Sequence, residues 1–155
     1  MCCISAQERL HSDIKVGWNS AIKQVFTNRE HIMSAQLFQG SCHCGAVKFE
    51  VRTTLSPATR CNCSLCRRRG ALMSAPFEEQ ELRVLSGEDA LTLYQFNTRA
   101  ARHFFCKHCG IYPFHQTRLN PKLWRVNIGC LDGVDPYSLE AGIANGAALS
   151  VVEDA

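Results

Sequence analysis

Seven of the ten cysteines in this sequence stand at short, regular spacings that suit metal chemistry. They form a CxC pair, a CxCxxC run and a CxxC pair. In chain order these are Cys42 and Cys44; Cys61, Cys63 and Cys66; and Cys106 and Cys109. Residues two apart on a strand point the same way, and a CxxC turn brings two sulfurs to one ion. Both spacings therefore indicate metal binding, with zinc the ion that best suits thiolate ligands.

The first and last groups look like two halves of one site, because each is followed directly by a glycine. Gly45 and Gly110 permit the positive φ with which a knuckle turns its backbone N–H groups towards the sulfurs. We predict a structural zinc ion held by Cys42, Cys44, Cys106 and Cys109. Such a site closes a loop of over sixty residues, so the protein without zinc should be much less stable. The alternatives are reduced cysteines in a core, or a disulfide.

The CxCxxC run offers three thiols and no evident fourth ligand. Three protein ligands with an open position are typical of catalytic zinc. The guanidinium groups of Arg67, Arg68 and Arg69, which follow directly, would steady the anionic centre and lower the thiol pKa values. The alternative for the arginines is an exposed surface turn. The alternative for the run is a second structural zinc completed by a histidine. The candidates for that ligand are His43, His103, His108 and His115.

The segments that must position these cysteines have the pattern of short β-strands. In AVKFEV, the apolar Val47, Phe49 and Val51 alternate with charged residues, which predicts one buried sheet face. Similar runs, separated by turn signals, stand at 82–85, 91–96, 102–106 and 123–131. The pattern predicts a mainly β domain. Cys130 lies in the last run, where a free cysteine is usually a small core residue.

The two ends of the chain fit this pattern less well. We predict an N-terminal extension over 1–33, a zinc-binding domain over 34–140 and a C-terminal tail over 141–155 that forms coil or a short helix. The extension is either a docking helix or a segment without fixed structure ahead of a natural start at Met33. Apolar residues recur in it at helical spacing, namely Ile14, Trp18, Ile22, Val25 and Phe26. Its Cys2 and Cys3 receive no role.

Composition sets broad limits on function. The 155 residues are 46% apolar and 20% charged, as in an ordinary globular protein. No stretch approaches the ~18 to 20 apolar residues of a membrane span, and there is no signal peptide, which predicts a cytoplasmic location without a membrane partner. The pI of about 8.4 lies below the values above ~9 that suggest nucleic acid, and a small anionic ligand fits equally well. The oligomeric state is not predicted.

The order of the motifs resembles one known family. CxCG, then CxCxxC followed by arginine, then FCxxCGI, with LTLYQFNT before the last cluster and VNIGCLDG after it, is similar to the glutathione-dependent formaldehyde-activating enzymes, a family that includes centromere protein V. The resemblance runs from Gln39 to Tyr137. It implies an Mss4-like fold, a β-tent of several coiled antiparallel sheets built around a structural zinc. It also implies two zinc ions per chain, one structural and one catalytic, with Cys61, Cys63 and Cys66 holding the catalytic ion.

The resemblance implies a chemistry as well. The family condenses formaldehyde with glutathione to S-hydroxymethylglutathione, a carbon-sulfur lyase reaction when written backwards. The partners would be glutathione, or another thiol, and an aldehyde. We expect zinc to deliver the bound thiol next to the aldehyde, largely a proximity effect. Arg67 or Arg68 would bind the carboxylates of glutathione, and His115 is a candidate proton carrier.

Two other functions remain open at this point. The first is an interaction module similar to centromere protein V, in which both zinc ions are structural and the partner is chromatin or another protein. The small charge excess and the lack of aromatic residues among the arginines do not favour nucleic acid. The second is a lyase that acts on a different thiol adduct. It would share the site and differ only in the lining of the pocket.

Overall fold

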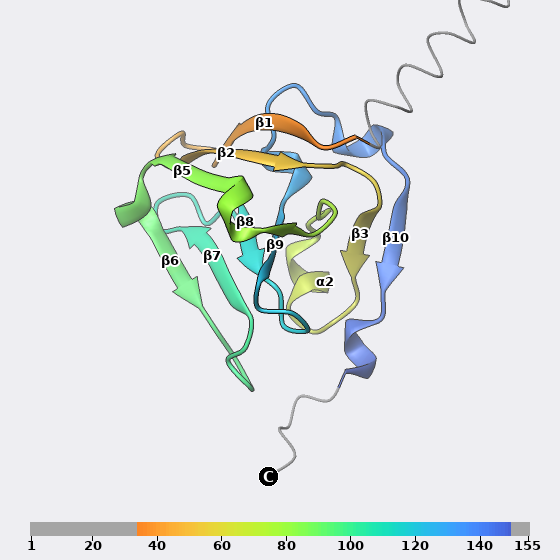
Figure 1. Cartoon of the computed structure of the whole chain (residues 1–155). Helices are drawn as coiled ribbons and strands as arrows, with labels where there is room; N and C mark the ends of the chain where they lie inside the picture. Colours follow the sequence, from red (N-terminus) through yellow and green to blue (C-terminus); the bar gives the residue numbers. More distant parts are fainter. Residues whose placement is uncertain (1–33, 150–155) are drawn as a thin grey trace, which may run out of the picture.

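The computed structural model describes residues 34–149, in which short strands form three small sheets joined by helical turns (Figure 1). This confirms the prediction of a mainly β fold, and it agrees with the Mss4-like architecture that the resemblance implies. The proposed extension over 1–33, with Cys2 and Cys3, lies outside the described residues, so both interpretations of it stay predictions.

The first sheet has three antiparallel strands in the order β1, β2, β5. They are β1 (Gln36–Ser41), β2 (Lys48–Thr53) and β5 (Leu82–Ser86). The alternation read from the sequence places the side chains correctly, because Val47, Phe49 and Val51 are all fully buried. The neighbouring charged positions, Lys48 and Glu50, remain exposed or half-buried.

The largest sheet has five antiparallel strands in the order β4, β9, β8, β7, β6. They are β4 (Phe77–Glu78), β9 (Leu123–Val126), β8 (Phe114–Gln116), β7 (Arg102–Cys106) and β6 (Leu91–Tyr94). The predicted run 102–106 coincides with β7. The predicted run 123–131 does not form one strand, because the Asn127 side chain accepts a hydrogen bond from the Gly129 N–H at 3.2 Å and starts a helical turn.

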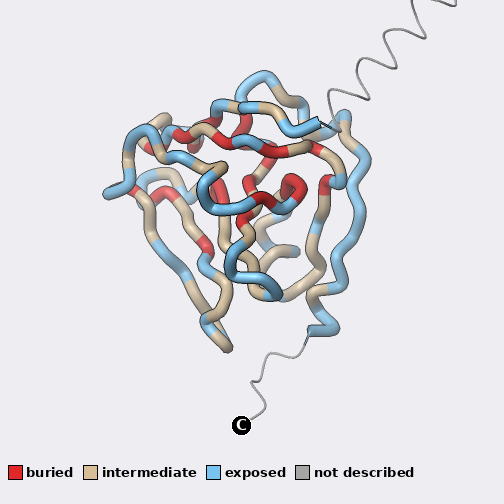
Figure 2. The backbone as a smooth tube through the Cα atoms, viewed as in Figure 1, coloured by how far each residue is buried: buried red, intermediate tan, exposed pale blue. Residues whose placement is uncertain are grey.

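The remaining pair, β3 (Ala58–Cys61) and β10 (Ala141–Ala144), is parallel. It runs down one side of the molecule (Figure 1). The expectation of coil or a short helix in the tail is therefore wrong for Ala141–Ala144. All four residues are exposed, so the strand carries no apolar alternation that a sequence pattern could reveal (Figure 2). Pairing of its backbone with β3 holds it in place.

Helical segments in the described residues are short. The single α-helical turn is α2 (Cys66–Arg69), which ends at Gly70 with φ of +64°. The others are 3-10 turns, of which the last follows β10 and the rest lie between strands: η1 (Glu79–Glu81), η2 (Glu88–Ala90), η3 (Ile128–Cys130), η4 (Pro136–Ser138) and η5 (Gly146–Ala148). Among residues 34–149, no helix is long and apolar enough to cross a membrane.

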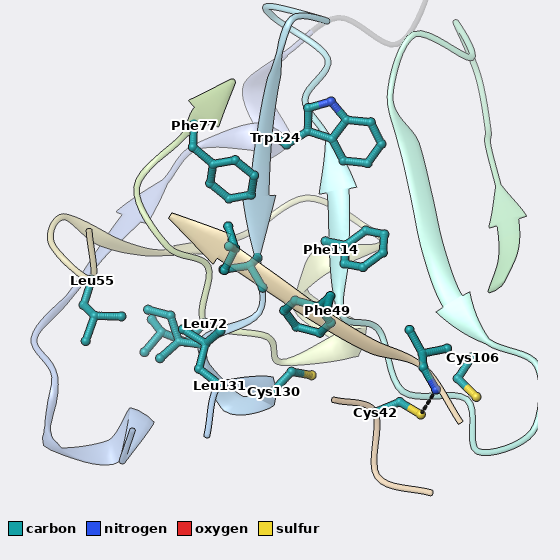
Figure 3. Packing of buried hydrophobic residues seen from close by; sticks show 14 of the residues in the cluster. Cys42, Phe49, Leu55, Leu72, Phe77, Cys106, Phe114, Trp124, Cys130 and Leu131 are labelled. Carbon is teal, nitrogen blue, oxygen red and sulfur yellow. Dashed lines mark hydrogen bonds between the residues drawn. The ribbon is translucent and has the colours of Figure 1, made fainter. Parts of the chain in front are cut away.

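The core lies where the first and the five-stranded sheets meet (Figure 3). Phe49 of β2 meets Phe114 of β8 edge to face, with ring centroids 5.5 Å apart and planes at 87°. Phe104 of β7 stacks on Trp124 of β9 with centroids 5.5 Å apart. Aromatic pairs of this kind add about 0.5–1.5 kcal/mol to the free energy of burial. Cys130 is also buried here, as its place in an apolar run predicted.

Candidate metal centres and the cleft beside them

The two outer cysteine groups form one cluster of four sulfurs. The Sγ atoms of Cys42, Cys44, Cys106 and Cys109 all lie within 4.8 Å of one another. Cys42 Sγ is 3.5 Å from Cys44 Sγ, which in turn is 3.7 Å from Cys106 Sγ. Two sulfurs bound at ~2.3 Å to a tetrahedral zinc ion lie about 3.8 Å apart, so the cluster could hold this ion with little change.

Matching backbone turns hold the two halves of this four-cysteine cluster. Gly45 and Gly110 have φ of +74° and +73°, which confirms the left-handed turns expected after each pair. The Gly45 N–H donates to the Cys42 carbonyl at 3.0 Å, and the Gly110 N–H donates to the Cys106 carbonyl at 2.8 Å. Each turn thus exposes the N–H groups that follow it to the sulfurs.

Backbone N–H groups stabilise the sulfurs as thiolates. The Val47 N–H donates to Cys42 Sγ at 3.3 Å (Figure 3). Hydrogen bonds from the backbone of Ile111 and then of Cys44 lower the pKa of Cys109 to about 6. Thiolate is the form that binds metal. The surroundings thus favour thiolate at Cys42 and Cys109, whereas the pKa of Cys44 is raised to about 11.

The CxCxxC run forms a second cluster at the start of α2. The Sγ atoms of Cys61, Cys63 and Cys66 also lie within 4.8 Å of one another. We call these residues the cysteine triad. Cys61 ends β3 and Cys66 begins α2, whose N–H at Cys66 donates to Cys63 Sγ at 3.4 Å. Burial raises the pKa of Cys66, and the charges of Cys63 and Cys61 raise it further. Three thiolates so close together would repel one another, and a bound divalent cation would offset this electrostatic repulsion.

Among residues 34–149, no histidine or carboxylate joins the cysteine triad at ligand distance. His43 and His108 are exposed within the turns of the other cluster. His103 instead places its Nδ1 atom 2.9 Å from the Tyr112 hydroxyl oxygen. A second structural site completed by a histidine is therefore not what the geometry favours. A metal ion here would keep a position to which none of the described residues supplies a ligand.

A cleft of about 740 Å³ opens beside the cysteine triad. Its walls come from the β3 and α2 junction, from the loop between β6 and β7, from the loop between β8 and β9, and from the residues after β10. Three arginines line it, Arg67, Arg118 and Arg125, and none of its described lining residues is Asp or Glu. This charge balance suits an anionic ligand.

The three consecutive arginine side chains of α2 have three different surroundings. Arg67 is exposed and lines the cleft. Arg68 donates to the Ser64 carbonyl at 2.5 Å and is not among the lining residues. Arg69 lies with its guanidinium carbon 4.0 Å from the centroid of the Tyr112 ring. The sequence suggested Arg67 and Arg68 as substrate ligands. Arg67 lines the cleft, and Arg68 does not.

Two neighbouring histidines, the buried His103 and the half-buried His115, line the cleft. His103 of β7 lies opposite His115 of β8, with ring centroids 5.4 Å apart. Burial and the charge of Arg69 lower the pKa of His103 to about 4. Burial, followed by the charges of His103, Arg125 and Arg69, lowers the pKa of His115 to about 3. Both rings are therefore neutral near pH 7. The Nδ1 atom of His115 is buried and has no hydrogen-bond partner among the described residues.

Sequence reasoning missed Arg125, Tyr112 and the C-terminal segment as parts of this site. Arg125 reaches the cleft from β9 and donates to the Ser74 carbonyl at 3.1 Å. Tyr112 follows the CxxCGI motif directly, and its place in sequence gives no sign of the contact with Arg69. The chemical signal for both was weak, because an arginine or tyrosine within a strand-rich segment usually has a structural role.

Residues 141–149, which we call the C-terminal strap, run beside the cysteine triad. Ala144 pairs with Cys61 in the parallel ladder, and the Asn62 N–H donates to the Ala144 carbonyl at 3.1 Å. The side chain of Asn62 donates to Asn145 Oδ1 at 2.9 Å and accepts from the Ala147 N–H at 2.8 Å. The strap is thereby fixed to the metal-binding loop, and several of its residues line the cleft.

Fold and site together define a small, mainly β domain with two cysteine clusters that could bind zinc. The family model for the glutathione-dependent formaldehyde-activating enzyme matches residues 37–144. This chain therefore belongs to that family. The match extends past Tyr137, where the motif resemblance ended, and includes β10.

Two individual proteins are similar to this chain. A protein of Halomonas elongata, named "Putative glutathione-dependent formaldehyde-activating enzyme", is 33% identical over 82 residues. The match covers 48% of this chain and 52% of the relative, so the chain spans about half the length of that curated protein. A crystal structure of a Rhodobacter sphaeroides protein is 49% identical, with a TM-score of 0.66, and the match covers 68% of this chain and 99% of the other.

Proposed function

We propose that the protein is a zinc-dependent enzyme of the carbon-sulfur lyase type, which joins glutathione and formaldehyde to S-hydroxymethylglutathione. One observation supports this most strongly. The cysteine triad has three sulfurs and no fourth described protein ligand, and it faces a cleft lined by arginines. In this proposal the cysteine triad holds a catalytic zinc ion, and Cys42, Cys44, Cys106 and Cys109 hold a structural one.

The reaction needs no oxidant and no third substrate. The thiol sulfur forms a bond to the carbonyl carbon, the C=O π bond breaks, and the thiol proton ends on the new hydroxyl oxygen. A zinc ion on the cysteine triad would supply a position where the thiol is held as thiolate beside the aldehyde. Two reactants held in one place avoid much of the entropic cost of a bimolecular encounter.

The chain's own residues would orient the substrate. Arg67 and Arg125 line the cleft from two different elements, α2 and β9, and could each bind a carboxylate of glutathione. His115 has a pKa of about 3, so at neutral pH it would serve as a neutral hydrogen-bonding group facing the aldehyde oxygen or its hydroxyl product. A role as a proton carrier would require a protonated form that these surroundings disfavour.

Isothermal titration of zinc-loaded protein with glutathione tests the site. We expect binding by the wild type and by Cys130→Ser, because Cys130 is buried outside both clusters. Cys63→Ser should lose binding. Equal binding by all three proteins would remove the proposed role of the cysteine triad. A rate assay then separates an enzyme from a carrier, because glutathione and formaldehyde also combine without a catalyst.

A lyase acting on a larger thiol adduct is a second candidate, and the composition of the cleft favours it. Phe96, Leu119 and Leu123 give the cleft apolar walls that formaldehyde alone would not fill. Ligand pockets usually lie near 300–1,000 Å³, so this cleft could admit a longer aldehyde with glutathione. Rates measured with formaldehyde and with a series of longer aldehydes would distinguish the two.

A further inference from the structure

The C-terminal strap passes close to the cysteine triad at Gly146. A Cβ atom at this position would lie 2.5 Å from Cys61 Sγ and 3.1 Å from Cys63 Cβ. Carbon and sulfur atoms that are not bonded do not approach to 2.5 Å, because van der Waals repulsion is steep at that distance. Gly146 is not among the described glycines with positive φ. Its lack of a side chain therefore matters for space and not for backbone conformation.

The strap cannot easily move away from this contact. Asn62, between two members of the cysteine triad, binds the strap on both sides of Gly146 through Asn145 Oδ1 and the Ala147 N–H. The ladder between β3 and β10 adds the pairing of Ala144 with Cys61. A side chain at position 146 would thus displace the sulfur more readily than the strap.

We propose that Gly146 is a positioning residue for the cysteine triad, and that the strap is the wall that fixes Cys61 and Cys63 for metal binding. The bare backbone of Gly146 closes one side of the triad. The side that remains open then faces the cleft, where His115 and Arg67 also lie. This inference rests on the proposed metal site and adds to it a residue that contributes no ligand atom.

Cobalt binding to Gly146→Ala tests the inference, because Co²⁺ bound by thiolates absorbs strongly and so reports its own ligands. The matched control is Gly142→Ala in the same strap, where a Cβ would meet only Ala58 O, at 3.8 Å. We expect wild type and Gly142→Ala to take up two Co²⁺ ions per chain. Gly146→Ala should bind the second ion about tenfold to a hundredfold more weakly, as outer-sphere changes around metal ligands commonly do. The absorption of the four-cysteine cluster should not change, which shows that the variant is folded.

A second variant tests how Gly146 acts. In Asn62→Ala the strap loses its hydrogen bonds to the Asn62 side chain and can move away from the cysteine triad. Adding Gly146→Ala to this variant should therefore reduce cobalt affinity less than Gly146→Ala does in the wild type. Equal cobalt affinity in Gly146→Ala and Gly142→Ala would overturn the inference and leave the proposed metal site intact. If the losses of cobalt affinity in the two single variants simply add in the double variant, the idea that Asn62 holds the strap against the cysteine triad would be contradicted as well. Uptake of a single ion by the wild type would contradict the metal site itself, and with it this inference.

Discussion

The Nδ1 atom of His103 lies 2.9 Å from the hydroxyl oxygen of Tyr112, and both side chains are buried. Arg69 lies over the ring of this tyrosine, with its guanidinium carbon 4.0 Å from the Tyr112 ring centroid. Burial with a cation nearby keeps the imidazole neutral. The helical turn α2, which begins with Cys66 and carries Arg69, is thereby joined to β7 and to the residues just before β8.

This contact predicts a pH dependence of stability. The pKa of His103 falls from 6.5 to about 4 on folding, so the unfolded chain binds the proton more readily. The free energy of unfolding should therefore decrease as the pH falls below 6.5, a loss that continues to about pH 4. At pH 5 this loss is about 2 kcal/mol for one histidine, and His115 adds to it.

Urea unfolding of wild type and His103→Gln at pH 7.5 and pH 5 would measure this effect. Glutamine at position 103 does not titrate, so the stability of the variant should fall less than that of the wild type between the two pH values, although His115 still contributes to both proteins. Zinc loss in acid affects both proteins and cancels in the comparison. The exposed His43→Gln should behave as the wild type. Parallel pH profiles for wild type and His103→Gln would show that His103 is not held neutral.

The four-cysteine cluster predicts a difference between two serine variants. Cys106→Ser should lose cooperative folding, because the zinc site ties the end of β1 to the end of β7. Cys63→Ser should still fold and retain about one zinc ion per chain. Zinc content by mass spectrometry and thermal unfolding would check both, with Cys130→Ser as the control that keeps both ions. Loss of folding in Cys63→Ser would contradict a purely catalytic role for its metal.

The arginine run predicts unequal effects of neighbouring substitutions. Arg67→Ala should weaken glutathione binding about tenfold, the loss expected for one charged hydrogen bond. Arg68→Ala should leave affinity nearly unchanged, because the Arg68 side chain bonds to the Ser64 carbonyl of its own turn. Titration calorimetry would compare them at fixed ionic strength. The reverse order of effects would mean that the substrate approaches from the other side of α2.

The packing of the core predicts that truncating the Phe49 side chain strongly destabilises the protein. Phe49→Ala should reduce the free energy of unfolding by about 3–5 kcal/mol, because it leaves a cavity and removes the contact with Phe114. Tyr137→Ala is the control, since the Tyr137 side chain is 90% exposed and should change stability by at most about 0.5 kcal/mol. Urea unfolding of zinc-loaded proteins would measure both. A small effect at Phe49 would place the core elsewhere.

Much of the fold could be read from local patterns. The alternation at Val47, Phe49 and Val51 reports burial of one face directly, and the five residues 102–106 form β7 as predicted. The cysteine spacings also predicted which sulfurs would gather. These signals are local, because they depend on the period of a strand or the reach of a tight turn.

The parts that could not be predicted depend on contacts between distant segments. β10 is exposed along its whole length and forms only by pairing with β3, over eighty residues earlier in the chain. His103 and His115 meet through the register of β7 and β8, which sequence spacing does not reveal. The need for a glycine at position 146 can be recognised only from the structure, which places this residue next to Cys61. A small residue in a weakly patterned tail gave no sign of that contact.

X-ray absorption at the zinc edge would test the central claim most directly, because it counts the sulfur ligands of bound zinc. With one site of four cysteines and one of three, wild-type protein should show an average of about 3.5 sulfur ligands per zinc ion. Adding glutathione should raise this average to about 4 as its thiolate enters the open position. An average that does not change with glutathione, or a histidine nitrogen bound at the second site, would contradict the account.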